Sequence, residues 1–151
     1  MTEARANAAH ERAQKHFQEL KNSDKQYPSI DSPELMSMVA SDLECASQLT
    51  YVHFDMTDLN APEFQQISKL PNVKVISFYD CEGIETLLGH AANMPSVNKI
   101  YFFCARPSDG LLKKLAAIPN LKTVKFNDVS DGDLDIFKRA LPRLHFEVGD
   151  D

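Results

Sequence analysis

The sequence lacks several features that would point to particular classes of protein. It contains no tryptophan and only five glycines, and no apolar run approaches the roughly 20 residues that a membrane-spanning helix needs. Lysine and arginine total 16 against 22 aspartates and glutamates, so the surface is not basic like that of most nucleic-acid-binding proteins. The first residues carry no apolar segment of the kind found in secretory signals. We therefore expect no membrane insertion, no nucleic-acid binding and no secretion.

Cysteine is also scarce, and no motif for metal or nucleotide chemistry is present. Cys45, Cys81 and Cys104 are odd in number and have apolar neighbours, so we expect buried free thiols in a cytoplasmic protein. No Cys/His spacing predicts a zinc site, and there is no glycine-rich phosphate loop or Gly-x-Ser-x-Gly elbow. His53 beside Asp55 is the only pair that suggests acid–base chemistry. The sequence predicts no metal, no cofactor and no enzyme activity.

What is present is a repeat. The pattern apolar-Pro-x-apolar-x-x-apolar-x-Phe occurs three times, and its prolines, Pro71, Pro95 and Pro119, are spaced 24 residues apart. An earlier copy without the proline covers 49–54, and a truncated copy begins at Leu141. A constant period of roughly 20–29 residues is typical of proteins built from stacked strand–helix units.

The repeat predicts where strands and helices lie. We expect strands over 49–55, 73–79, 97–103, 121–127 and 144–148, and helices around 62–68, 84–92, 108–117 and 131–140. Ser108 is the expected N-terminal cap of the helix around 108–117. Alternation along the strands predicts a single inward column of aromatic rings, made by Phe54, Phe78, Phe102 and Phe126. Residues 47–148 would therefore form one stack of repeats with a shared parallel sheet.

Residues 1–46 are expected to form a helical cap with a degenerate first repeat at about 23–46. The first helix has an apolar stripe of Ala9, Ala13, Phe17 and Leu20. The second helix begins near Ser32 and Pro33, and its expected inward residues are Leu35, Val39, Leu43 and Ala46. The first helix has two interpretations, a cap on the stack or an arm that binds another molecule. Residues 149–151 form a short acidic tail.

The repeat has the form apolar-x-x-apolar-x-apolar, and the position three residues after its last apolar residue is held by Thr57, Cys81, Ala105 and Val129. With these motifs, residues of about 43–148 resemble the leucine-rich repeat superfamily, and most closely its ribonuclease-inhibitor-like or cysteine-containing branch. Phenylalanine stands where that family usually has leucine. The resemblance implies an α/β solenoid with a parallel sheet on the concave side and helices on the convex side. It also implies a non-catalytic module that binds another protein.

The side chains that alternate with the inward residues face away from the core. The candidates for partner binding are Tyr51, His53, Asp55, Tyr79, Lys99, Tyr101, Phe103 and Lys125. We expect Tyr79 and Phe103 to be adjacent, because they occupy equivalent places in neighbouring repeats. Exposed aromatic side chains often anchor interfaces. The alternative is that tyrosine and phenylalanine are present because they favour strands.

Two classes of function remain open. The first is a binding module of the inhibitor, immunity or adaptor type, whose aromatic concave face meets an unidentified protein partner. The second is a structural protein that forms a homo-oligomer, either through the N-terminal helix or through the last strand. Two interpretations of the last strand remain: Phe146 and Val148 join a second copy or a partner strand, or the acidic tail keeps this end monomeric.

Overall fold

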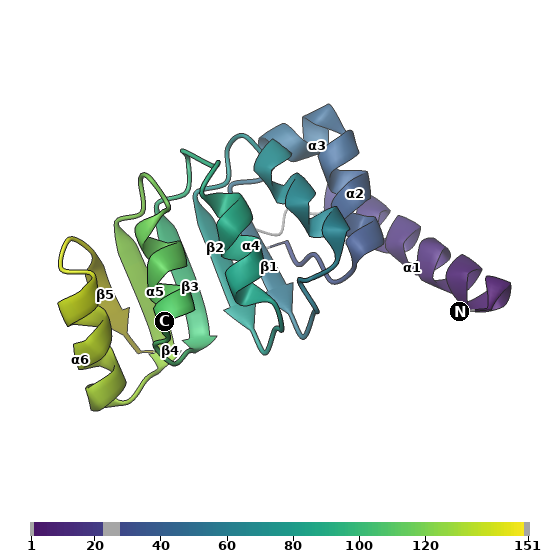
Figure 1. Ribbon diagram of the computed structural model, residues 1–151. Coiled ribbons are helices and arrows are strands. Elements are labelled where there is room, and N and C mark those ends of the chain that lie inside the picture. Colours follow the sequence, from purple (N-terminus) through teal and green to yellow (C-terminus); the bar gives the residue numbers. More distant parts are fainter. Residues whose placement is uncertain (1, 23–27, 150–151) are drawn as a thin grey trace.

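The computed structural model describes residues 2–22 and 28–149 and shows an α/β protein. Figure 1 shows helices at the N-terminal end, followed by strands and helices in alternation. In order, the elements are α1 (Glu3–Lys21), α2 (Pro33–Ser41), α3 (Leu43–Gln48), β1 (Tyr51–Asp55), the 3-10 helix η1 (Pro62–Lys69), β2 (Val75–Tyr79), α4 (Ile84–Ala91), β3 (Lys99–Cys104), α5 (Asp109–Ala116), β4 (Thr123–Asp128), α6 (Asp131–Ala140) and β5 (His145–Val148). The acidic tail residues 150–151 lie outside the described ranges.

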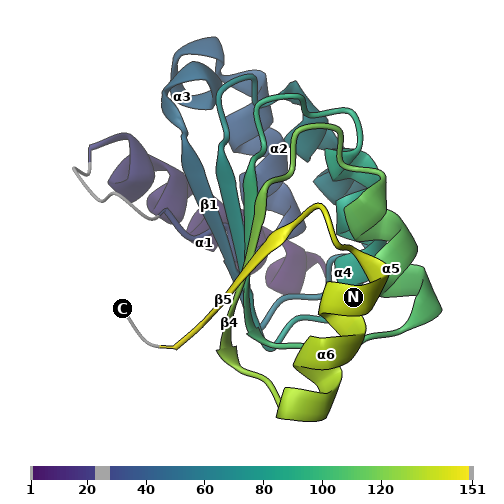
Figure 2. The same ribbon diagram turned by 90° about the vertical axis from the view of Figure 1, so that its left-hand side faces the viewer.

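The five strands form one parallel sheet in the order of the sequence. From β1 to β4, residues 24 apart are paired, as in Tyr51↔Val75 and Lys99↔Thr123. Between β4 and β5 the offset falls to 22, as in Thr123↔His145, because the last repeat is shorter. The period of the sequence therefore sets the register of the sheet, and the expected α/β class with a parallel sheet is confirmed. Figure 2 shows α4, α5 and α6 together on one side of the sheet.

The predicted column of phenylalanine rings is confirmed. Phe54, Phe78, Phe102 and Phe126 are buried, and consecutive rings stack with centroids 5.8, 5.7 and 5.8 Å apart. Ser108 caps α5, since its Oγ accepts a hydrogen bond from the backbone N–H of Leu111 at 3.1 Å. The column ties neighbouring strands together along the whole core.

The connection after β1 is a helix at the predicted place but of a tighter kind. Residues Pro62–Lys69 form a 3-10 helix. Its buried side chains, Phe64 and Ile67, are three residues apart and therefore share one face of a helix with three residues per turn.

The single helix expected after Ser32 is divided in two at Asp42. Asp42 ends α2 and caps α3, its carboxylate accepting a hydrogen bond from the backbone N–H of Cys45 at 2.9 Å. Because the helix breaks here, α3 has a different orientation from α2, and Leu43 is 85% exposed. The prediction that Leu43 points inward was therefore wrong. Met36 and Ala40 are buried in α2 instead, beside the expected Leu35 and Val39, and Ala46 is buried in α3 as expected.

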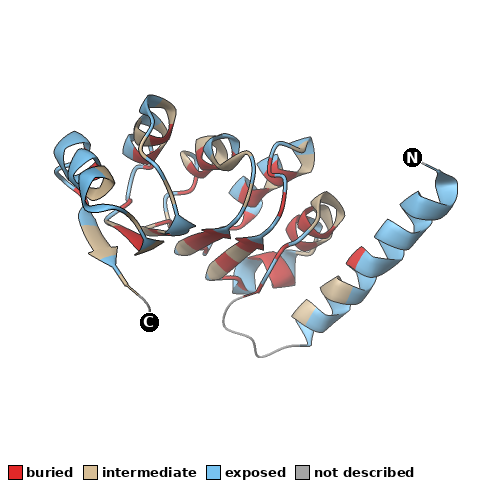
Figure 3. Ribbon diagram, turned by 90° about the horizontal axis from the view of Figure 1, so that it is seen from below, coloured by how far each residue is buried: buried red, intermediate tan, exposed pale blue. Residues whose placement is uncertain are grey.

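Helix α1 packs its apolar side chains against the rest of the chain through its C-terminal half. Ala13 is buried, and Phe17 and Leu20 are partly buried against the core. Ala9, expected in the same stripe, is exposed, because α1 extends past the edge of the sheet there (Figure 3). The Nδ1 atom of His10 lies 3.4 Å from the Glu34 carboxylate, and near the other end of α1 an ion pair joins Lys21 to Asp42 at 3.3 Å. No helix in the described ranges is long and apolar enough to cross a membrane.

The three thiols are free, but they are not all buried. Cys45 is buried and Cys81 is partly buried, whereas Cys104 is exposed. The expectation of buried thiols was wrong for Cys104, because this residue ends β3 at the edge of the sheet, where the next helix does not cover it.

Candidate functional site

One face of the sheet is not covered by η1, α4, α5 or α6, and we call it the open face (Figure 2). Its most exposed aromatic residues are Tyr79 at 38% and Phe103 at 41%. Their rings meet edge to face, with centroids 4.6 Å apart and an angle of 84° between the planes, so the predicted adjacency is confirmed. The preceding residues, Phe78 and Phe102, belong to the buried ring column, which holds the exposed pair on a rigid support.

Lys125 does not flank the aromatic residues as an exposed charge. It is only 5% exposed, and its Nζ lies 5.4 Å from the centre of the Tyr101 ring, a cation–π distance. The half-buried Tyr101 lies beside it in register, because β3 and β4 pair these two residues. The expectation that Lys125 is an exposed charge beside the aromatic residues was therefore wrong. Its stem and charge are used within the open face itself.

Lys99 remains half-exposed and takes part in a small charged group. Its Nζ lies 3.5 Å from an oxygen of Glu147, and the other oxygen of Glu147 lies 3.5 Å from His145 Nε2. Glu147 was not among the predicted site residues. Alternation in the last strand was the signal that would have placed it on the same face as Lys125, with which it pairs.

His53 is held by a neighbouring strand. Its Nδ1 shares a 2.6 Å hydrogen bond with the Oγ of Ser77, the residue opposite it in β2. Burial lowers the pKa of His53, and the negative charge of Asp55 opposes this shift in part. The imidazole is therefore neutral at pH 7. Ser77 is only 2% exposed, so its hydroxyl fixes the ring and is not accessible to a substrate.

Cys81 lies apart from His53 in its interactions. Its thiol donates hydrogen bonds to the backbone carbonyls of Phe54 at 3.3 Å and Tyr79 at 3.4 Å. Burial is the main reason that the pKa of this thiol is raised. Cys81 is therefore a protonated structural thiol at pH 7 and does not complete a nucleophile–base pair with His53.

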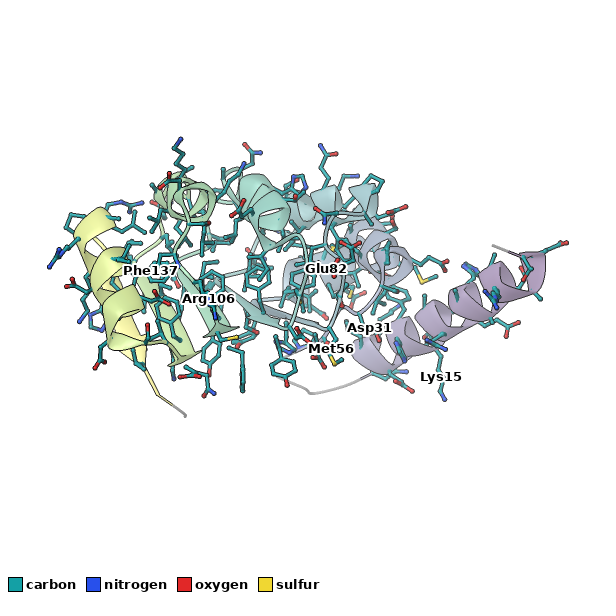
Figure 4. The ribbon with its side chains drawn as sticks, turned by 60° about the horizontal axis from the view of Figure 1, so that its bottom comes forward. Lys15, Asp31, Met56, Glu82, Arg106 and Phe137 are labelled. Carbon is teal, nitrogen blue, oxygen red and sulfur yellow. The ribbon has the colours of Figure 1, made fainter. Side chains whose placement is uncertain are left out.

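The carboxyl ends of β1 and β2 carry a feature that the sequence did not reveal. Met56 and Asp80 directly follow these strands and adopt left-handed backbone conformations, with φ of 48° and 50°. Met56 is 71% exposed, and Figure 4 shows it pointing away from the ribbon. Its backbone N–H donates to the carbonyl of Tyr79 at 2.8 Å. The 24-residue spacing makes the two positions equivalent, but neither is a glycine, the usual signal of this conformation.

Three of the predicted residues thus lie together as an exposed group at the carboxyl ends of the strands. Asp55 is exposed beside Met56, and Tyr79 and Phe103 follow on the next two strands. The remaining predicted residue, Tyr51, is half-buried at the start of β1. Together with Asp80 and Asp128, which are exposed, the edge combines apolar rings with carboxylates. None of these three carboxylates forms an ion pair with another described residue.

Two hollows lie away from the predicted residues. One, of about 420 Å³, lies between the carboxyl ends of β2 and β3 and the N-termini of α4 and α5, and includes Arg106 (Figure 4). The α5 terminus beside it is already occupied by Glu85, whose carboxylate accepts a hydrogen bond from Ser108 Oγ at 3.0 Å. The other, of about 770 Å³, lies between the end of α1 and the segment before β1. Across 2–22 and 28–149, no three His, Cys, Asp or Glu side chains are placed to hold a metal ion.

Comparison with protein-family models, with curated proteins and with solved structures finds no match. The function therefore has to be argued from the geometry of the chain itself.

Proposed function

We propose that the chain is a leucine-rich-repeat solenoid that binds a protein partner through the open face of its sheet. The constant 24-residue register and the continuous phenylalanine column support the solenoid. In Figure 3 the helices that follow the strands lie in an outer row and the strands in an inner row, an arrangement that supports a concave open face.

A second ladder joins neighbouring repeats and supports the same assignment. The residue after each repeated proline donates a hydrogen bond to a backbone carbonyl of the preceding unit, 2.7 Å in each case. The three bonds are Asn72 Nδ2 to Ser47, Ser96 Oγ to Val73, and Asn120 Nδ2 to Pro95. A side chain that recurs at one place and satisfies the previous unit is what stacked repeats require.

The segment before β1 behaves as a degenerate first repeat in this proposal. Ser29 forms a parallel bridge with His53, again 24 residues away. The backbone of His53 donates to Pro28 at 2.9 Å and accepts from Ile30 at 3.0 Å. Ile30 is buried beneath Phe54, the equivalent position in the next unit. Residues 28–30 thus cover the edge of β1, and Pro28, which has no N–H to donate, lies in this edge segment, where proline is tolerated.

The observation that carries the binding function is the Tyr79–Phe103 pair. Two large rings in edge-to-face contact stay about 40% exposed, at 38% and 41%, on a rigid face that the described helices leave open. Aromatic side chains in fixed positions bury much area at little entropic cost, so they are frequent anchors of interfaces. The nearby carboxylates of Asp55, Asp80 and Asp128 favour a partner that brings lysine or arginine to the rim.

The test compares the wild-type chain with a Tyr79→Ala/Phe103→Ala variant. The control changes two exposed helix residues, Lys113→Ala/Lys138→Ala. Each protein is used to capture partners, and a captured protein is then purified and its Kd measured. We expect the aromatic variant to raise Kd by at least about 100-fold, because two anchor residues are removed, and the control to leave it unchanged. Equal binding by a folded aromatic variant would refute the proposal.

The alternative function is self-assembly through α1 or the last strand, and the exposed N-terminal half of α1 favours it. Light scattering over a range of concentrations, on the full chain and on a version that starts at Ser29, separates the two. A dimer that is lost on truncation would move the function to self-assembly through α1. We propose that either function operates in the cytoplasm, where the three free thiols would stay reduced.

A further inference from the structure

The outer edge of β5 is the least protected part of the sheet. Among the described residues, β5 pairs with β4 alone. The backbone N–H groups of His145 and Gly149 donate inward, to Lys122 at 2.8 Å and Phe126 at 3.0 Å. Because successive residues of a strand direct their N–H and C=O groups to opposite sides, those of Phe146 and Val148 point to the outer edge. Unpaired groups of this kind pair readily with another strand.

The side chains at this end form the surface that another repeat would cover. Ile136 in α6 is 47% exposed, whereas the residue at its place two units earlier, Leu88, is fully buried. Val148 is 51% exposed. Phe146 continues the core, its ring stacked on Phe126 with centroids 6.3 Å apart, and is only partly buried. Apolar side chains therefore accompany the unpaired backbone groups.

We propose that a second copy of this chain pairs with β5 in the antiparallel direction, about a two-fold axis at Phe146. In this register the outward groups of Phe146 exchange hydrogen bonds with Phe146 of the second copy. The outward N–H of Val148 meets the carbonyl of Leu144, whose own N–H already donates to Leu141 at 3.1 Å. Val148 and Leu144 are both apolar and both lie on the core side of the sheet. The register that pairs the outward backbone groups therefore also places apolar side chains opposite each other.

The pairing of polar side chains selects the same register. Residues directly opposite in an antiparallel pair lie on one face. His145 therefore lies opposite Glu147 of the second copy, and the reverse pair forms on the other side of the axis. If the axis passed through Glu147 instead, two carboxylates would face each other, which is destabilising. An axis between Phe146 and Glu147 would place an apolar core residue opposite a charged residue of the other face.

The dimer has a defined consequence for the open face. A two-fold axis perpendicular to the sheet keeps all helices on one side, and joins the two five-stranded sheets into one. It brings Ile136 of the two copies together over the new strand pair. The inference does not depend on partner binding by Tyr79 and Phe103, whose positions stay free in the dimer.

The first experiment measures the mass of the full chain by light scattering across a wide range of protein concentration. The variants are Val148→Pro, which removes only an outward N–H, and His145→Glu, which places like charges opposite each other. We expect a wild-type dimer whose Kd rises on the order of tenfold or more in each variant. Tyr79→Ala/Phe103→Ala is the control and should leave the dimer unchanged. Circular dichroism checks that each variant is folded, and the surface variant His145→Glu serves if the proline variant is not.

The second experiment tests the register by cross-linking in a Cys104→Ser background. Residues 145 and 147 would form a non-hydrogen-bonded pair between copies, with Cα atoms about 4.5 Å apart, close enough for a disulfide. His145→Cys/Glu147→Cys should give a covalent dimer on oxidation, and neither single variant should. A covalent dimer from Glu147→Cys alone, a monomer at every concentration, or a dimer that depends on α1 and not on Val148 or His145 would each overturn the proposal.

Discussion

The replacement of Phe102 by alanine tests the argument that the ring column holds the repeats together. Phe102 has no exposed surface, and its ring stacks on Phe78 at 5.7 Å and on Phe126 at 5.8 Å. Replacing a buried phenylalanine with alanine lowers the unfolding free energy of a protein by about 3–5 kcal/mol. Because the Phe102 ring has stacking partners on both sides, we expect a loss at the upper end of that range. Since domains have only about 5–15 kcal/mol in total, the variant should be close to unfolding.

The matched comparison is Phe146→Ala at the end of the column. Phe146 is partly buried, and β5 is the last strand of the sheet among the described residues, so replacing Phe146 should lower the unfolding free energy by distinctly less. Phe102→Leu keeps most of the volume and should lose about 1.5 kcal/mol or less. Urea unfolding followed by circular dichroism measures all three at low protein concentration. If Phe102→Ala and Phe146→Ala lose the same free energy, the column does not act as argued.

The remaining predictions concern a glycine and a histidine. Gly83→Ala should destabilise the protein, because Gly83 has a φ of 76° and an added Cβ would lie 2.8 Å from Asn60. In Gly132→Ala the added Cβ meets nothing within 4 Å, so this variant should be neutral or stabilising. Thermal unfolding compares the two, and equal losses would contradict the argument. Burial lowers the pKa of His53, so the folded protein binds fewer protons than the unfolded chain, and stability should fall as pH drops below the ordinary histidine value of about 6.5. A His53→Gln variant with the same pH dependence of unfolding as the wild type would show that this group is not responsible.

The periodic part of the fold was predictable because it depends on local pattern. The 24-residue spacing gave the order and register of the first four strands, and alternation within each strand gave the side on which Phe102 lies. The contact between Tyr79 and Phe103 followed from the same register. These features needed no knowledge of distant contacts, since equivalent residues of stacked units become neighbours.

The departures from prediction arise where one unit differs from the next. Asp42 offers its carboxylate as a cap and interrupts a helix, which turns Leu43 to solvent. Lys125 was expected to be exposed, but its long side chain lies over Tyr101 on the adjacent strand. The left-handed backbone at Met56 has no glycine to announce it.

The sequence by itself determined the repeat, the faces of the strands and the ring column, because the pattern of apolar residues has one period. Only the tertiary structure decided how much of each open-face side chain remains exposed, because that depends on neighbours across strands, as for Lys125 and Ser77. It also decided the character of the two ends. Residues 28–30 cover β1, while β5 keeps one edge unpaired among the described residues, since capping depends on which segment folds back in space.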